Sequence, residues 1–302
     1  MSNLLSSVIE LGLINALTVL ALFVSYRVLD ICDLSTDGCF TLGGAVGAMV
    51  AISFGPGLSL LAAIAAGMLC GLVTSLLQTK LGVNSLLAGI AVNTALYSVN
   101  IAVMKGSALI NLNKVTTVFS LTREALLQTP LAGCQTIIVA LIAVMLAVAF
   151  LNFFLQTRLG LALRATGDNH QMVENSSIDP HRMKIIGLII SGGLTALSGC
   201  LLAQSQKSVS IDIGSGILTV ALASLLIGRI FFTRGKLIVQ LIGSVLGSLL
   251  FRFIYALALK LNMPAYMLKL VSSLIVLLAI SLPYLQKQYP LFVRRLRQNR
   301  RA

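Results

Sequence analysis

Three carboxylates stand at breaks between long apolar stretches of the chain. Asp33 and Asp37 belong to the run Asp33-Leu-Ser-Thr-Asp-Gly38, and Asp212 belongs to a second polar break from Ser205 to Gly216. Ionisable groups beside apolar segments are costly to bury, so they usually cap a helix end or line a polar path. We expect Asp37 and Asp212 each to cap the short helix that follows, and direct contact with a solute is the alternative.

Two asparagines lie within a single apolar stretch. Asn93 and Asn100 are seven residues apart, which places them on one face of a helix. Amides in such positions face the interior of a helical bundle or hydrogen-bond to a neighbouring helix. With the polar residues of the breaks they form one set of candidates for the lining of a translocation path: Asp33, Ser35, Asp37, Asn93, Asn100 and Asp212.

A long polar segment runs from Arg158 to Lys184. We expect Gly167 to break the chain there and Asp168 or Asn169 to cap a short exposed helix. Asp179-Pro180 predicts the N-cap and first position of the next helix. A short helix held between two apolar helices suits the transmission of force from a partner, although an ordinary capped loop explains the pattern equally well. The candidate coupling residues are Thr166, Gly167, Asp168, Asn169, Met172, Val173 and Glu174.

No catalytic or metal-binding pattern is present in the sequence. His170 and His181 lack metal-ligand spacing, the five cysteines are scattered without a CxxC pair, and no GxxxxGK[ST] phosphate loop occurs. We therefore predict no catalytic residue, no metal ligand and no cofactor within this chain.

Several runs of residues resemble a known family of membrane proteins. Arg164 to Asn169, Asp179 to Lys184, Ser191 to Gln204 and Met267 to Ala279 are similar to the permeases of the branched-chain amino-acid and ribose ABC importers. The resemblance covers nearly the whole chain. It implies that the segment after Arg158 contains the helix that docks into an ATPase.

The N-terminal half resembles a narrower branch of that family. Tyr26 to Asp30, Asp33 to Gly38 and Thr79 to Gly82 are similar to permeases that are paired with binding proteins thought to carry aromatic amino acids, tryptophan in particular. The loop from Gly228 to Gly235 departs from the commoner, Gly-rich family form. The resemblance implies two ABC ATPase subunits that bind ATP and Mg²⁺, a second permease copy or paralogue, and an extracytoplasmic solute-binding protein.

The composition indicates an all-α protein that spans a lipid bilayer many times. The 302 residues are 57% hydrophobic and 10% charged, and the mean hydropathy is +0.97. A soluble domain carries about 25% charged residues. The net charge of +13 fits the positive-inside rule better than nucleic-acid binding, because Lys and Arg lie between the apolar stretches and in the tail.

The apolar stretches predict a bundle of about nine or ten transmembrane helices. The stretch from Gly38 is divided at Gly55-Pro56-Gly57 into a short helix and a second helix that ends at Lys80. The other expected helices span about Leu4–Val28, Leu86–Met104, Leu131–Leu155, Ile185–Gln204, Ile217–Phe232, Leu237–Leu259 and Met267–Leu285. The connection from Lys105 to Pro130 is polar and has room for a short surface helix. The helix from Ile217 is short for a full crossing.

The distribution of basic residues predicts the orientation. The denser group, expected to be cytoplasmic, comprises Arg27, Lys80, the 158–184 segment, the 229–236 loop and the tail from Arg294. The N-terminus is then outside and the C-terminus is cytoplasmic, in the plasma membrane of a bacterium.

We treat residues 1–302 as a single domain with repeat-like halves at about 30–104 and 207–285 and a coupling segment at about 158–184. In each half a polar break opens a short helix, and a Gly-xxx-Gly motif follows, at Gly67 and at Gly243. With opposite predicted directions, these halves fit an inverted repeat whose discontinuous helices meet inside the membrane.

Two other classes of protein share part of this pattern. An ion-coupled secondary transporter also uses inverted repeats and broken helices. A membrane-embedded enzyme would need a histidine or a pair of carboxylates inside the bilayer, which the sequence lacks. An ATP-driven importer that moves a small polar solute, with an amino acid as the expected cargo, fits the residues and the resemblance together.

Overall fold

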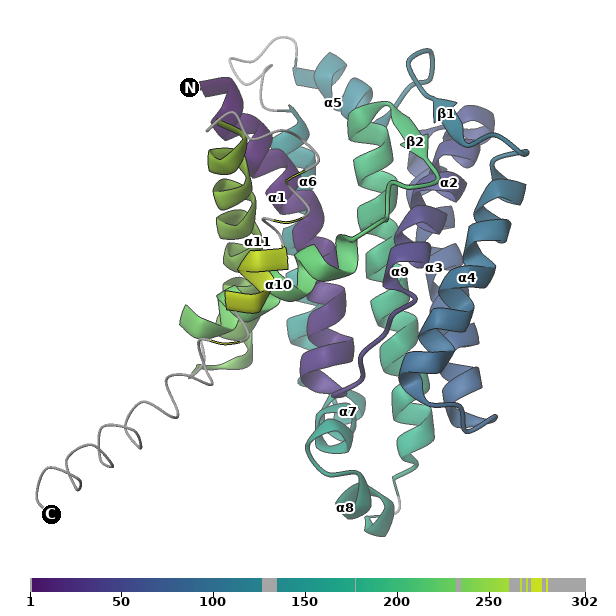
Figure 1. The fold of residues 1–302 in the computed structure, drawn as a ribbon, viewed down its shortest axis with the longest axis vertical. Helices are drawn as coiled ribbons and strands as arrows, with labels where there is room; N and C mark the ends of the chain where they lie inside the picture. Colours follow the sequence, from purple (N-terminus) through teal and green to yellow (C-terminus); the bar gives the residue numbers. More distant parts are fainter. Residues whose placement is uncertain are drawn as a thin grey trace, which may run out of the picture.

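The computed structural model describes residues 2–126, 135–176, 178–231, 235–260, 267, 270, 273–278 and 281, and they form a helical bundle (Figure 1). Within these residues, seven helices are long and apolar enough to cross a membrane. The expected polytopic all-α fold is therefore confirmed.

The elements follow the expected order along the chain. They are α1 (Ser2–Leu22), the π-helix η1 (Phe23–Val28), α2 (Thr36–Phe54), α3 (Pro56–Thr79), α4 (Ser85–Val103), β1 (Leu109–Asn111), α5 (Val118–Leu126), α6 (Gln135–Phe154), α7 (Arg158–Asp168), α8 (His170–Asn175), α9 (Pro180–Gln206), β2 (Ser208–Ser210), α10 (Ile217–Phe231) and α11 (Leu237–Lys260). The expected helix from Met267 to Leu285 lies mostly outside the described residues.

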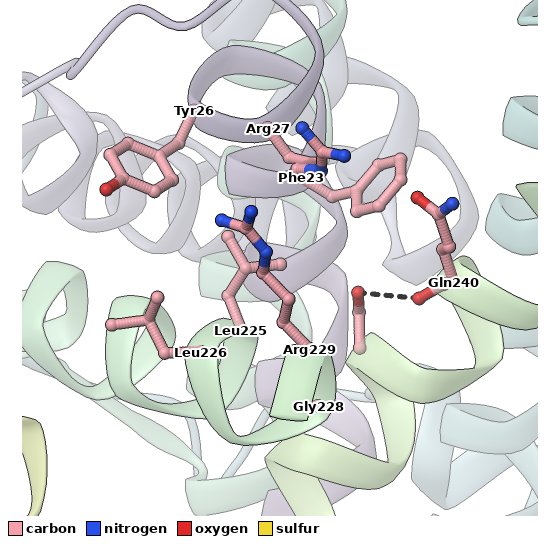
Figure 2. A pocket seen from close by; sticks show the side chains of 9 residues that line it. Phe23, Tyr26, Arg27, Leu225, Leu226, Gly228, Arg229 and Gln240 are labelled. Carbon is pink, nitrogen blue, oxygen red and sulfur yellow. Dashed lines mark hydrogen bonds between the residues drawn. The ribbon is translucent and has the colours of Figure 1, made fainter. Parts of the chain in front are cut away.

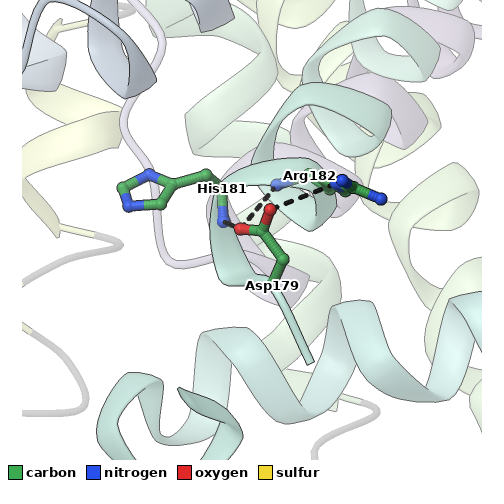
Figure 3. A network of polar contacts seen from close by, with 3 residues as sticks. All are labelled: Asp179, His181 and Arg182. Atoms are coloured by element: carbon green, nitrogen blue, oxygen red, sulfur yellow. Dashed lines mark hydrogen bonds and ion pairs between the residues drawn. The ribbon is translucent and has the colours of Figure 1, made fainter. Parts of the chain in front are cut away.

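Local signals explain where several helices begin. Pro56 occupies the first turn of α3, after Gly55 has ended α2 with a φ of 95°. The Asn84 side chain accepts a hydrogen bond from the Leu86 N–H and caps α4. Asp179 caps α9, as predicted: its Oδ1 accepts from the His181 N–H at 2.9 Å, and its Oδ2 lies 3.2 Å from Arg182 Nε (Figure 3).

Two features differ from the expected elements. The last turns of the first membrane helix widen into η1, which carries Arg27. β1 and β2 pair antiparallel, with Ile110 opposite Val209. The strand pair joins two polar connections that are about a hundred residues apart in sequence, which places both at the same end of the bundle.

Glycines bring the backbones of α2, α3 and α9 into contact. A Cβ added at Gly43 would collide with Ala196 of α9, and one at Gly67 of α3 would collide with the Gly192 carbonyl oxygen. A Cβ at Gly199 would meet the Phe40 carbonyl oxygen of α2. Small residues at such interfaces let membrane helices approach closely.

The two Gly-xxx-Gly motifs pack against different kinds of neighbour. Gly67 and Gly71 of α3 lie against α9, whereas Gly243 and Gly247 of α11 lie against α10. In the second half the motif therefore contacts the short helix of its own unit. In the first half it contacts α9 as well as α2, whose Cys39 Sγ lies 4.0 Å from the Gly67 carbonyl oxygen. The inverted repeat stays a prediction.

The bundle has two distinct ends (Figure 1). The N-terminus, α5 and the β1–β2 pair lie at one end, which we call the upper end as drawn. α7 and α8 lie at the opposite, lower end, and η1 points toward them. The sides expected for the N-terminus and for the 158–184 segment are therefore opposite, as the predicted orientation requires.

Candidate functional site

The first break in the chain places the start of α2 inside the bundle. A Cβ at Gly89, in the second turn of α4, would contact the backbone of Leu34, and one at Gly38 would contact Asn93 and Leu96. The chain leaves η1 at Leu29 near the lower end and begins α2 beside the middle of α4. α10 begins about halfway between the two ends as well (Figure 1).

Asp37 joins the starts of these two short helices. Its Oδ2 accepts a hydrogen bond from the Gly216 N–H at 3.0 Å, and its Oδ1 accepts from the Leu218 N–H at 2.8 Å. The first N–H groups of a helix lack partners within the helix, and a negative charge there interacts favourably with the helix dipole. Asp37 thus caps α10 and not α2, contrary to the expectation from the sequence.

Asp212 does not cap α10, because Asp37 occupies that position. The Asp212 side chain is exposed and makes no hydrogen bond within the described part of the chain. A Cβ at Gly214 would collide with the Asp37 carbonyl oxygen, so the 211–215 connection packs tightly against the start of α2.

Asp33 and Ser35 stabilise the turn that precedes α2. Asp33 Oδ1 accepts hydrogen bonds from the Ser35 N–H at 2.9 Å and from the Ser35 hydroxyl at 2.6 Å. Thr36 Oγ1 donates to the Asp33 carbonyl oxygen at 2.8 Å. Both Asp33 and Ser35 are buried and hydrogen-bonded to each other, so in this conformation they stabilise the turn that leads into α2.

A polar cleft of about 310 Å³ lies between the start of α2, the middle of α4 and the 211–215 connection. It brings together four of the six residues expected along a translocation path: Asp37, Asn93, Asn100 and Asp212. The rest of its lining consists of Gly38, Thr41, Thr94, Tyr97, Ile211, Gly214 and Ser215. Thr41, Thr94, Tyr97 and Ser215 were not expected from the sequence, although each lies within four residues of an expected lining residue.

Asn100 holds an unusual position in this cleft. Its side chain is 1% exposed, and its Nδ2 donates to the Gly38 carbonyl oxygen at 3.2 Å. Its Oδ1 is buried and has no hydrogen-bond partner among the residues that the structure describes. Because a buried acceptor without a partner costs about 1–3 kcal/mol, this atom is suited to receive a donor from a ligand.

The 158–184 segment contains two short helices at the lower end. The Asn169 side chain accepts from the Met172 N–H at 3.1 Å and caps α8, as one of the two predicted alternatives. Met172 is 56% exposed, and Asp168, Asn169 and Glu174 are exposed as well. These residues present an apolar side chain with polar neighbours on the surface of the lower end.

Three of the predicted coupling residues face inward. Val173 is 1% exposed, so the prediction that it is an exposed contact for a partner is wrong. Thr166 is buried and its hydroxyl donates to the Ala162 carbonyl oxygen. Gly167 does not break the chain but lies in the last turn of α7, where a Cβ would collide with the Val28 carbonyl oxygen. These residues attach the segment to η1 and the bundle.

A second, small pocket lies where η1 meets α10 and α11 (Figure 2). Arg27 of η1 and Arg229 of α10 both line it, with Tyr26 and Gln240. The Ser244 hydroxyl donates to the Gln240 carbonyl oxygen at 2.9 Å. Sequence reasoning counted both arginines as cytoplasmic charges and did not place them together, because their proximity depends on the packing of three helices.

The chain is similar to a known family of proteins over most of its length. The model of a family described as branched-chain amino acid transport system / permease component matches residues 4–280. The chain belongs to this permease family. It is therefore a multi-pass inner-membrane protein and the permease subunit of an ABC importer, whose family members work with a separate ATPase and a binding protein.

Individual relatives of this permease differ in the solute that they are named for. A tyrosine transport system permease protein of Clostridioides difficile (strain R20291) is 34% identical over 275 residues, which are 90% of this chain and 88% of that protein. The ribose import permease protein RbsC of Escherichia coli (strain K12) is 27% identical over 253 residues, 82% of this chain and 75% of that protein. The guanosine ABC transporter permease protein NupQ of Bacillus subtilis (strain 168) is 24% identical over 220 residues, 66% and 67% of the two chains. No solved structure matches the chain.

The family assignment decides between the classes left open by the sequence. It favours the ABC permease over an ion-coupled secondary transporter and over a membrane-embedded enzyme. The permease is a transport component, and hydrolysis of ATP is the task of a separate subunit in this family.

Proposed function

We propose that this permease imports an aromatic amino acid through the polar cleft, by alternating access driven by a partner ATPase. The observation that carries the proposal is the gathering of carboxylates, amides and hydroxyls in one cleft beside the contact between α2 and α10. A relative at 34% identity is named for tyrosine transport, which supports an aromatic amino acid as the cargo.

The surroundings of the cleft support a second permease subunit. α4 exposes large apolar side chains, among them Leu86, Leu87 and Ile90, next to the polar Asn93 and Thr94. Exposing carboxylates and amides to hydrocarbon is costly. The cleft therefore fits an interface with a second copy or a paralogue better than contact with lipid, so that the path is enclosed between two subunits.

The two ends of the bundle then have different partners. The lower end, with Met172 exposed, is the proposed contact with an ATPase subunit in the cytoplasm, which binds the ATP and Mg²⁺. The upper end, with α5 and the β1–β2 pair, is the proposed contact with the solute-binding protein. The C-terminus is cytoplasmic in this arrangement.

Uptake measurements test the proposed function. Cells that carry or lack this permease are compared for accumulation of radiolabelled L-tyrosine and L-tryptophan. We expect uptake that requires the permease, falls when ATP is depleted and persists when the membrane potential is collapsed at constant ATP. Uptake that stops with the membrane potential would instead support an ion-coupled transporter.

Met172 provides a specific test of the ATPase contact. Met172→Glu places a carboxylate where an apolar side chain is expected to be buried in the partner, and an unpaired buried charge costs about 3–5 kcal/mol. We expect the ATPase to be lost on purification of the variant while the permease stays folded, because Met172 is 56% exposed in the isolated chain.

Leu81→Glu is the matched control for this variant. Leu81 is 69% exposed in the turn between α3 and α4, which lies at the same lower end but to one side of α8 (Figure 1). The substitution makes a similar change from an apolar side chain to a carboxylate. The control is expected to retain the ATPase. If Met172→Glu retains it as well, α8 is not the contact, and the loop after α10 becomes the leading candidate.

A further inference from the structure

We infer that the cleft contains a subsite, built around Asn100, Asp37 and Asp212, that binds the protonated amino group of the cargo. The inference rests on the proposed function as an amino-acid importer, and it adds that the permease itself recognises one chemical group of its solute.

The charges and hydrogen-bonding groups of the cleft favour a cation. Two of the lining residues are carboxylates, and none of those described is Lys, Arg or His. Amides and hydroxyls supply the remaining polar groups. A cleft with this lining attracts a cation and repels a carboxylate, so the ammonium group of an amino acid is the part that it can hold.

The unpaired oxygen of Asn100 favours a ligand that donates a hydrogen bond. The Nδ2 bond to the Gly38 carbonyl oxygen fixes the amide orientation and leaves Oδ1 as an acceptor with no donor. An ammonium group has three N–H donors and no acceptor. A ligand of this class satisfies the buried oxygen, whereas a carboxylate cannot.

The remaining capacity of Asp37 supports the same ligand. Each of its two carboxylate oxygens accepts one backbone N–H, and an ionised carboxylate has about four acceptor positions in all. Asp37 can therefore keep its contact with α10 and still accept from a ligand. Tyr97, 53% exposed in the lining, adds an aromatic face that attracts cations.

The test measures binding of three probes to the permease co-purified with its ATPase, without the binding protein. The probes are radiolabelled L-tyrosine, tyramine, which lacks the carboxylate, and 3-(4-hydroxyphenyl)propionate, which lacks the amino group. We expect tyramine to bind at least about ten-fold more tightly than the propionate, since a hydrogen bond to a charged group contributes about 1.5–3 kcal/mol.

Variants locate the subsite. Asn100→Leu should weaken tyramine binding about ten-fold or more, whereas Asn152→Leu makes the same change on α6, outside the cleft, and should leave it unchanged. Because Asn100→Leu also removes the bond to Gly38, Asp212→Asn is the second variant. Its exposed side chain has no hydrogen bond to lose, and it should reduce the preference for tyramine over the propionate.

The outcomes separate this inference from the proposed function. Equal affinity for tyramine and the propionate, no measurable tyramine binding, or wild-type tyramine binding in both cleft variants would each overturn the subsite, even where ATP-dependent uptake is intact. Failure of the wild-type permease to support any ATP-dependent amino-acid uptake would instead overturn the proposed function.

Discussion

Replacing Asp37 with asparagine tests the contact that joins the starts of α2 and α10. The substitution keeps the shape of the side chain and one acceptor oxygen, but it turns the other oxygen into an NH₂ group. That group would face either the Gly216 N–H or the Leu218 N–H, and a donor cannot bond to a donor.

The expected loss of stability follows from these bonds. One charge-assisted hydrogen bond disappears, which costs about 1.5–3 kcal/mol and leaves an N–H of the helix start without its partner. Removal of the negative charge beside the start of α10 lowers the stability by about a further 0.3–2 kcal/mol. We expect a total of about 2–4 kcal/mol, since the two contributions overlap.

The loss of stability is measured by heating the detergent-solubilised permease in the absence of added solute and following its unfolding by fluorescence-detected size exclusion. Asp212→Asn is the control, because it removes the same charge from an exposed side chain that has no hydrogen bond, and surface changes of this kind stay within about 0.5 kcal/mol. Asp37→Asn should unfold several degrees lower than the control. If the two variants unfold together with the wild type, the hydrogen bonds from α10 do not contribute to stability and the cap is wrongly assigned.

Two further predictions concern the lower end and the orientation. Gly167→Ala adds a Cβ that collides with the Val28 carbonyl oxygen, so it should destabilise the permease by about 1–3 kcal/mol. It should also reduce solute-stimulated ATP hydrolysis. The control Gly57→Ala, where a Cβ meets nothing within 4 Å, should change neither the stability nor the hydrolysis. Reporter fusions near Asn113 and after Ala302 should give opposite signals, external for the first and cytoplasmic for the second, and identical signals would overturn the predicted helix count.

Much of the bundle could be predicted from the sequence because hydropathy and capping are local signals. Pro56 and Asp179 mark helix starts by their own chemistry, and both are found where expected. The π-helix η1 and the β1–β2 pair could not be predicted in this way. The first depends on how the turns before Arg27 are hydrogen-bonded, and the second depends on two connections meeting across the fold.

The cleft shows the same division between local and long-range information. Asn93 and Asn100 share a face because of helix geometry, which the sequence contains. That Asp37 caps α10 and not α2 depends on a contact between residues about 180 positions apart, and no local pattern encodes it. Likewise, the sequence predicts that Val173 is exposed together with its neighbour Met172, whereas in the fold Val173 is buried and only Met172 is exposed.

The close backbone contacts among α2, α3 and α9 have a mechanical consequence. Helices separated by layers of side chains can slide by small steps, but helices whose carbonyl oxygens touch the opposite backbone meet a steric barrier to sliding. We expect these three helices to move as one rigid body. α8 precedes α9 in the chain, so a displacement of α8 at the lower end would rotate α9, and α2 with it. This rotation would move the side of the cleft that α2 forms relative to α10, and it would strain the two hydrogen bonds from α10 to Asp37.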